Sequence, residues 1–406
     1  MYVRTISMLF YLFFTCVIFN PQVSGVTIYL YTILPFLDPG FSAFLISTLR
    51  RWIVPVGMAI TVCLLSNPMV AAKIVSIAVC VSYLMYTILR RIEYLHLWMA
   101  INVLFGLAQF ALYYADFGLS VQLGPDEVSK MLWGGSATQT NTNYYEILYF
   151  ARVSGFSREA GFFASLLSAS FVLYLYQRGR NKWVLMLYFL GLVISLSKAS
   201  FVLLIFALLY CVRQRLRAVH PLASLIAFFT ITMVIALYMN QYDFFGSATF
   251  AHRLAGYPFL LDARFSDIVR GVTARQLTNE YGYLPYVSMN RDLYFVNDAT
   301  FASIPGLFAD LGLISALVLL GVFAFTASDG FVILLCLLIT ATVGMTTVTS
   351  FVPIAYLICY WPRFVAYLNA QRQRSNPSMR SRFVQRSRPR QSPPTPASAC
   401  DEFISI

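Results

Sequence analysis

Residues 152–176 have the sequence RVSGFSREAGFFASLLSASFVLYLY, and this stretch indicates the class of fold. Two arginines and a glutamate, Arg152, Arg158 and Glu159, stand at the start of a long apolar run. Charged residues beside lipid-compatible sequence are candidates for a functional site, because lipid disfavours charge. We therefore expect this stretch to meet two other polar stretches, Ser195–Ser200 and the interval from about 240 to 300, on one side of a membrane. Together they would handle an anionic, lipid-linked substrate.

The composition of the whole chain agrees with a membrane protein. Of 406 residues, 59% are hydrophobic and 11% are charged, and the mean hydropathy is +0.70. A soluble domain carries about 25% charged residues. Apolar runs of about twenty residues recur along the chain, which predicts an all-α polytopic membrane protein rather than a barrel.

Basic residues form short clusters between the apolar runs. The net charge of +12 therefore indicates membrane topology, and we expect no nucleic-acid partner. Arg50-Arg51 and Arg90-Arg91 stand at every second junction, whereas Asn67-Pro68 marks an opposite one. The positive-inside rule then predicts about twelve crossings with both termini in the cytoplasm. The expected helical runs include 6–19, 26–48, 52–66, 69–89, 94–115, 159–176, 219–239, 301–326, 331–347 and 351–368.

The first of these runs, 6–19, has two interpretations. It lacks a convincing small-x-small cleavage site, which favours an uncleaved helix over a signal peptide. At the other end of the chain, arginines alternate with Ser, Pro and Gln. We therefore predict a membrane domain over residues 1–369 and a basic, disordered cytoplasmic tail over residues 370–406.

Cysteine and histidine residues are placed unfavourably for disulfides or metal binding. The seven cysteines lie in apolar runs, at their edges or in the tail, and no C-x-x-C occurs. The three histidines are scattered singly. We predict no disulfide framework, no metal site and no cofactor.

The run 183–212 is flanked by basic clusters at both ends, so it should cross the membrane an even number of times. Fourteen residues of helix span only about 21 Å, so two short helices fit, with Ser195–Ser200 as the turn between them. Lys198 would then lie at the floor of an outward-facing cavity. One long tilted helix is the alternative.

Two outer loops are predicted, over about 116–150 and about 240–300. The second alternates charged and aromatic residues and is too apolar for a plain linker. Arginine forks suit pyrophosphate, and aromatic faces suit sugar rings. The candidate substrate-binding residues in this loop are Arg264, Arg270, Arg275 and Arg291.

Three segments together resemble the bacterial O-antigen and exopolysaccharide polymerases, a superfamily shared with the O-antigen ligases. Residues 152–164 resemble the Arg-x-x-Gly-hydrophobic pattern of that family. Ser195-Leu-Ser-Lys-Ala-Ser200 resembles its Ser-x-Ser-Arg-small turn, although Lys198 stands where Arg is usual. Residues 297–312 resemble the segment that closes its large periplasmic loop. The similarity covers roughly residues 145–320.

The resemblance implies a reaction in the bacterial inner membrane. A glycan would move from its undecaprenyl pyrophosphate carrier onto another carrier-linked repeat unit at the periplasmic face. Such a transfer needs cations to stabilise the departing diphosphate and a base for the acceptor hydroxyl. Arg152 and Arg158, with Lys198 and the loop arginines, are candidates for the first role, and Glu159 and Asp298 for the second. A chain-length regulator and a flippase are expected partners.

Two other functions stay open at the level of sequence. An O-antigen ligase would transfer the glycan to lipid A core, but ligases of this superfamily typically place a His where Asn297-Asp298 stands here. A flippase or other transporter of lipid-linked oligosaccharide would carry charges along helices in both halves of the chain.

Overall fold

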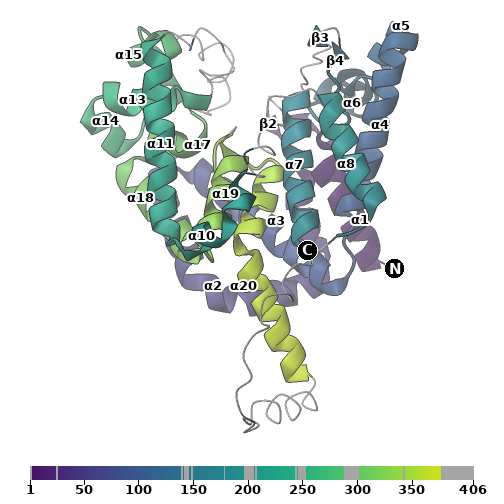
Figure 1. Cartoon of the computed structure of the whole chain (residues 1–406), viewed down its shortest axis with the longest axis horizontal. Coiled ribbons are helices and arrows are strands. Elements are labelled where there is room, and N and C mark those ends of the chain that lie inside the picture. Colours follow the sequence, from purple (N-terminus) through teal and green to yellow (C-terminus); the bar gives the residue numbers. More distant parts are fainter. Residues whose placement is uncertain are drawn as a thin grey trace, which may run out of the picture.

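The structure is a computed structural model that describes residues 2–23, 26–138, 140, 146–147, 150–177, 179–195, 205, 208–242, 245, 253–287, 301–341 and 343–375. The described part of the chain is all-α, apart from two hairpins of two-residue strands (Figure 1). Three described helices are long and apolar enough to cross a membrane: α3 (Pro68–Arg90), α4 (Leu95–Ala115) and α11 (Pro221–Gln241). The prediction of an all-α chain with membrane-spanning helices is confirmed to this extent, while the count of about twelve crossings stays a prediction.

The first 38 residues form a helix and an irregular return segment rather than two helices. Helix α1 (Tyr2–Thr15) is followed by η1 (Val17–Phe19) and the hairpin β1 (Gln22–Val23) and β2 (Val26–Thr27). Two short 3-10 helices, η2 (Leu30–Thr32) and η3 (Leu34–Leu37), then return along α1. The return ends where α1 begins, because the Tyr2 hydroxyl donates to the Leu37 carbonyl at 3.2 Å.

The expected helix over 26–48 is therefore wrong. Asp38 caps the next helix, α2 (Pro39–Ser66), and its carboxylate accepts from the backbone N–H of Gly40 at 2.9 Å. Pro39 at the first helical position favours a helix start there, since its missing N–H would have no partner in any case. Arg50-Arg51 consequently lies inside α2, not between two helices. Asn67 caps α3 in the same way, so the predicted junction at Asn67-Pro68 is confirmed.

Four helices on one side of the molecule pack around the stretch that begins at Arg152. Helices α7 (Ala160–Tyr176) and α8 (Lys182–Ser195) lie beside α4, and α1 lies against α4 (Figure 1). Short elements cover the end of α4: α5 (Phe117–Gln122), α6 (Pro125–Trp133), η4 (Gly134–Ser136) and the hairpin β3 (Glu146–Ile147) and β4 (Phe150–Ala151). The predicted outer loop over 116–150 thus contains regular structure.

The other side of the molecule is built on α11, to which α10 (Arg213–Ala218) leads. The predicted outer loop over 240–300 contains α13 (Gly256–Asp262), α14 (Phe265–Arg270) and α15 (Ala274–Tyr281). Helices α13 and α15 share a small hydrophobic cluster whose members include Phe259, Leu277, Tyr281, Tyr286 and Phe301. Much of this interval is therefore a folded helical unit.

Helices α3, α19 (Gly330–Thr340) and α20 (Phe351–Ser375) pack between the two sides. The expected helix over 301–326 is broken at Gly312 into α17 (Ser303–Leu311) and α18 (Leu313–Thr326), because Gly312 has a φ of +77°. The expected helix over 331–347 ends at Thr340. Helix α20 continues to Ser375, so the first residues of the predicted tail are helical.

The basic clusters gather at one end of the molecule, which we call the basic end and define by Arg90, Lys182 and Arg217. The Gln177 amide, at the end of α7, donates to the carboxylate of Glu93 in the α3–α4 connection. Arg217 lies close to Tyr176 at the end of the same helix. The small hairpin β3–β4 and helices α13–α15 lie at the opposite end (Figure 1). Lys182 and Arg217 therefore lie at the same end of the molecule, while the even number of crossings between them stays a prediction.

Candidate functional site

The segment from Arg152 to Glu159 is irregular. It contacts η1, α4 and α8 and leads into α7. The Val153 N–H donates to the Ile194 carbonyl near the end of α8, at 3.4 Å. The Ile18 N–H donates to the Phe156 carbonyl at 3.2 Å. Helix α7 then starts at Ala160, directly after Glu159. We call residues 152–159 the arginine segment.

Asn102, in the middle of α4, holds the centre of the arginine segment in place. Its side-chain oxygen accepts from the Phe156 N–H at 2.8 Å, and its amide donates to the Thr15 carbonyl at 3.1 Å. The ring of Phe156 stacks on Phe105 with 3.9 Å between centroids. Gly155 has a φ of +55°, and a Cβ at this position would lie 2.2 Å from the Asn102 oxygen. The tight turn at Gly155 therefore requires glycine.

Arg152 is a partly buried cation with an unsatisfied donor. Its Nε is buried and has no hydrogen-bond partner among the residues that the structure describes. Burial lowers the pKa of the Arg152 guanidinium, and the nearby carboxylate of Glu159 partly offsets this effect. A buried guanidinium N–H without a partner is costly, so this group is prepared to receive an anion. The buried hydroxyl of Ser157, in the same segment, also lacks a hydrogen-bond partner in the described part of the chain.

Arg158 connects the arginine segment to the irregular return segment near the N-terminus. Its guanidinium hydrogen-bonds the Tyr29 hydroxyl. The ring of Tyr29 packs against Tyr31 with 5.2 Å between centroids, and the Tyr31 hydroxyl donates to the Val348 carbonyl. Arg158 is thereby linked to the connection between α19 and α20.

The α19–α20 connection, residues 343–350, also contacts α17, the helix that follows the interval 240–300. The Ser303 N–H, at the start of α17, donates to the Val343 carbonyl at 2.9 Å. At the other end of the connection, the Ser350 hydroxyl donates to the Phe14 carbonyl. The segment that closes the interval 240–300 therefore contacts the same connection that Tyr31 binds. The described parts of the three predicted polar stretches gather at the end opposite the basic end.

The described loop arginines lie on the surface of the unit that α13, α14 and α15 form. Arg264, Arg270 and Arg275 are exposed. Arg264 forms a long ion pair with Glu280, at 3.7 Å, and both side chains are well exposed. Such pairs contribute little to stability, so these arginines are available to a ligand but are not held in one geometry. Lys198, Arg291 and Asp298 lie outside the described residues.

Sequence reasoning missed two residues that build this region, Asn102 and Tyr29. Asn102 had a usable signal, because a polar amide in the middle of an apolar run is expensive unless it has a structural or functional partner. Tyr29 had none, because a single tyrosine in an aromatic-rich apolar run is common. Its contact with Arg158 depends on the return of residues 29–37 along α1.

Comparison with known proteins adds no relative. No family model, no curated protein and no solved structure matches the chain.

Proposed function

We propose that this chain is a metal-independent membrane glycosyltransferase that polymerises undecaprenyl-pyrophosphate-linked oligosaccharide repeat units. The site would face the periplasm from the bacterial inner membrane. The observation that carries the proposal is the buried Nε of Arg152, which no described residue hydrogen-bonds, in an irregular segment that also holds Arg158 and Glu159. Two guanidinium groups near one carboxylate suit a substrate with two phosphates and a reacting hydroxyl.

The proposed transfer requires two things from the protein: cations that stabilise the leaving diphosphate and a base for the acceptor hydroxyl. The acceptor hydroxyl oxygen attacks the anomeric carbon of the donor sugar, and the bond from that carbon to the diphosphate oxygen breaks. The diphosphate leaves with the bonding electrons, and Arg152 and Arg158 stabilise its charge. The acceptor proton passes to a base, for which Glu159 is the described candidate. The base Asp298 and the cations Lys198, Arg264, Arg270, Arg275 and Arg291 remain further candidates.

The position of the arginine segment supports a lipid-anchored substrate. It stands at the start of the apolar helix α7 and beside the end of α8, another apolar helix. A carrier with a long polyisoprenyl tail enters from the membrane, so its phosphates stay near the ends of such helices. The exposed arginines of α14 and α15 suit the sugar portion, which extends into water.

The first prediction tests the two arginines. Arg152→Ala and Arg158→Ala should each leave single repeat units and little long polymer. Each charge-assisted hydrogen bond is worth about 1.5–3 kcal/mol. Its loss at the transition state should slow transfer on the order of a hundredfold. Arg→Lys should restore polymer length only partly, because lysine restores the charge but not the bidentate hydrogen bonds of a guanidinium. Glycan length is measured by gel in a deletion strain that carries each variant.

Arg215→Ala is the matched control, because Arg215 is an exposed arginine at the basic end. It should give wild-type polymer. Membrane abundance is followed by immunoblot in every strain. Normal polymer from both alanine variants at normal abundance would refute the role of the arginine segment. The deletion itself separates the alternatives: single units on the core support a polymerase, polymer retained on the carrier indicates a ligase, and absence of both indicates a flippase.

A further inference from the structure

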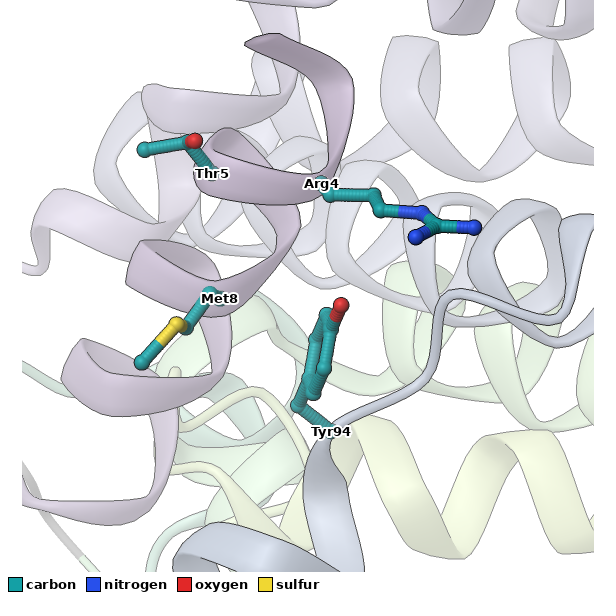
Figure 2. Close-up of a pocket in the computed structure, with 4 residues that line it drawn as sticks. All are labelled: Arg4, Thr5, Met8 and Tyr94. Carbon is teal, nitrogen blue, oxygen red and sulfur yellow. The ribbon is translucent and has the colours of Figure 1, made fainter. Parts of the chain in front are cut away.

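A pocket opens at the basic end, far from the arginine segment. It has a volume of about 340 Å³ and is lined by Arg4, Thr5 and Met8 of α1 and by Tyr94 (Figure 2). Tyr94 directly precedes α4. The Ala151 N–H binds Tyr114 near the other end of that helix, and twenty helical residues span about 30 Å. The pocket and the arginine segment therefore lie near opposite ends of α4.

The start of α4 places this pocket at the boundary between water and lipid. If α4 crosses a membrane, for which it is long and apolar enough, the residue before it lies at the level of the lipid headgroups. Tyrosine and tryptophan favour this level. Trp98, one turn into α4, donates its indole N–H to the Met8 carbonyl at 3.1 Å and so fixes α1 against α4 beside the pocket.

The pocket carries a positive charge, Arg4, that is not ion-paired with any described carboxylate; the nearby Glu93 accepts hydrogen bonds from Gln177 instead. Arg4 is exposed and forms no ion pair or hydrogen bond with any residue in the described part of the chain. Figure 2 shows its guanidinium extended toward the α3–α4 connection, and the Tyr94 hydroxyl points to the same side. Arg91, an exposed residue of that connection, adds a second positive charge. The pocket therefore suits an anion.

Apolar side chains continue from the pocket along α1 and α4. Met8 is 45% exposed, Leu9 is 38% exposed and Leu97 is 50% exposed. They lie within about one turn of the residues that line the pocket. A cationic site at the level of the headgroups, continued by an apolar surface, matches the two parts of a phospholipid.

We propose that this pocket binds an anionic phospholipid of the adjacent leaflet. Its phosphate binds Arg4 and the Tyr94 hydroxyl, and its acyl chains lie along Met8, Leu9 and Leu97. Charge complementarity selects an anionic lipid over a zwitterionic one, because a cationic headgroup would meet Arg4 and Arg91. This inference does not depend on the proposed glycosyl transfer.

Native mass spectrometry of the full chain in detergent tests the proposal. The protein is titrated with phosphatidylglycerol and, separately, with phosphatidylcholine. Phosphatidylglycerol should bind more tightly, and Arg4→Gln should weaken it about tenfold, the size of one charge-assisted hydrogen bond. Tyr94→Phe should weaken it less, because the ring remains. Arg215→Gln, an exposed arginine at the same end but outside the pocket, is the control and should bind like wild type.

Several results would overturn the proposal. Equal binding of the two lipids by the wild-type protein would remove the anionic selectivity. If Arg4→Gln and Arg215→Gln weaken phosphatidylglycerol binding equally, the binding depends on general surface charge and not on this pocket. Displacement of the lipid by equimolar glycerol 3-phosphate would show a phosphate site that does not hold acyl chains. Arg4 is exposed, so Arg4→Gln should keep the thermal unfolding midpoint of the wild-type protein.

Discussion

At the scale of single residues, the arginine segment depends on one backbone turn. Gly155 adopts a left-handed conformation against Asn102, and the Asn102 side chain binds the N–H of the next residue, Phe156. The same amide also binds Thr15, so one buried side chain joins α1, α4 and the arginine segment. The positions of Arg152 and Arg158 therefore depend on residues that carry no charge.

Gly155→Ala should destabilise the protein by about 2–3 kcal/mol. The left-handed conformation costs a residue with a Cβ roughly 1–2 kcal/mol, and loss of the Phe156–Asn102 hydrogen bond costs about 1 kcal/mol more. Thermal unfolding in detergent measures the effect. Gly321→Ala is the control, because nothing lies within 4 Å of a Cβ there, and it should leave the midpoint unchanged or raise it slightly. Equal midpoints for the two variants would show that the turn tolerates a Cβ.

At the scale of elements, a polar network joins three helices at the basic end. Glu93, in the α3–α4 connection, accepts from the Gln177 amide at the end of α7. His96 of α4 contacts Gln177 at 2.8 Å and the Tyr188 hydroxyl of α8 at 2.7 Å. Because each partner comes from a different element, the network fixes the ends of α4, α7 and α8 relative to one another.

The network predicts a pH dependence of stability. Burial raises the pKa of the Glu93 carboxyl, and the nearby His96 and the Gln177 hydrogen bonds partly oppose this shift. The unfolded chain then loses the Glu93 proton at a lower pH, about 4.3, than the folded protein does. Folded stability should therefore fall as pH rises from the unfolded pKa through the folded one, and then level off.

Glu93→Gln should remove this loss, because the side chain no longer ionises. The difference in unfolding midpoint between the variant and the wild-type protein, taken from about pH 4 to pH 8, should shift in favour of the variant as pH rises. Glu127→Gln, at an exposed carboxylate, is the control and should keep the wild-type profile. A constant difference between Glu93→Gln and the wild-type protein across this range would contradict the prediction.

At the scale of the whole molecule, the structure separates a basic end from an end that carries the arginine segment and α13–α15 (Figure 1). Lys182 and Arg217 lie at the basic end, and Tyr281 lies in α15. If the chain spans a membrane as proposed, reporter fusions at Lys182 and Arg217 should both indicate the cytoplasm. A fusion at Tyr281 should indicate the periplasm. Opposite locations for Lys182 and Arg217 would favour the single tilted helix between them.

The sequence by itself determined the class of the protein and the grouping of its charges. A composition of 59% hydrophobic residues leaves the backbone few soluble options, and helices satisfy their own hydrogen bonds in lipid. Helix starts such as Asn67-Pro68 were also predictable, because a cap followed by proline acts locally. The outcome was different for the predicted helix over 26–48, because apolar composition alone does not distinguish an α-helix from the short 3-10 helices that residues 30–37 contain.

Only the tertiary structure decided how the site is assembled. Residues 29–37 contain short 3-10 helices rather than an α-helix and pack along α1, while Tyr31 binds Val348 and packs against Phe14. These contacts bring Tyr29 to Arg158, a partner more than a hundred residues away in the chain. The break at Gly312 likewise depends on its close approach to Arg270. Hydropathy and spacing describe a residue and its near neighbours, whereas these features depend on packing between distant segments, which no local pattern specifies.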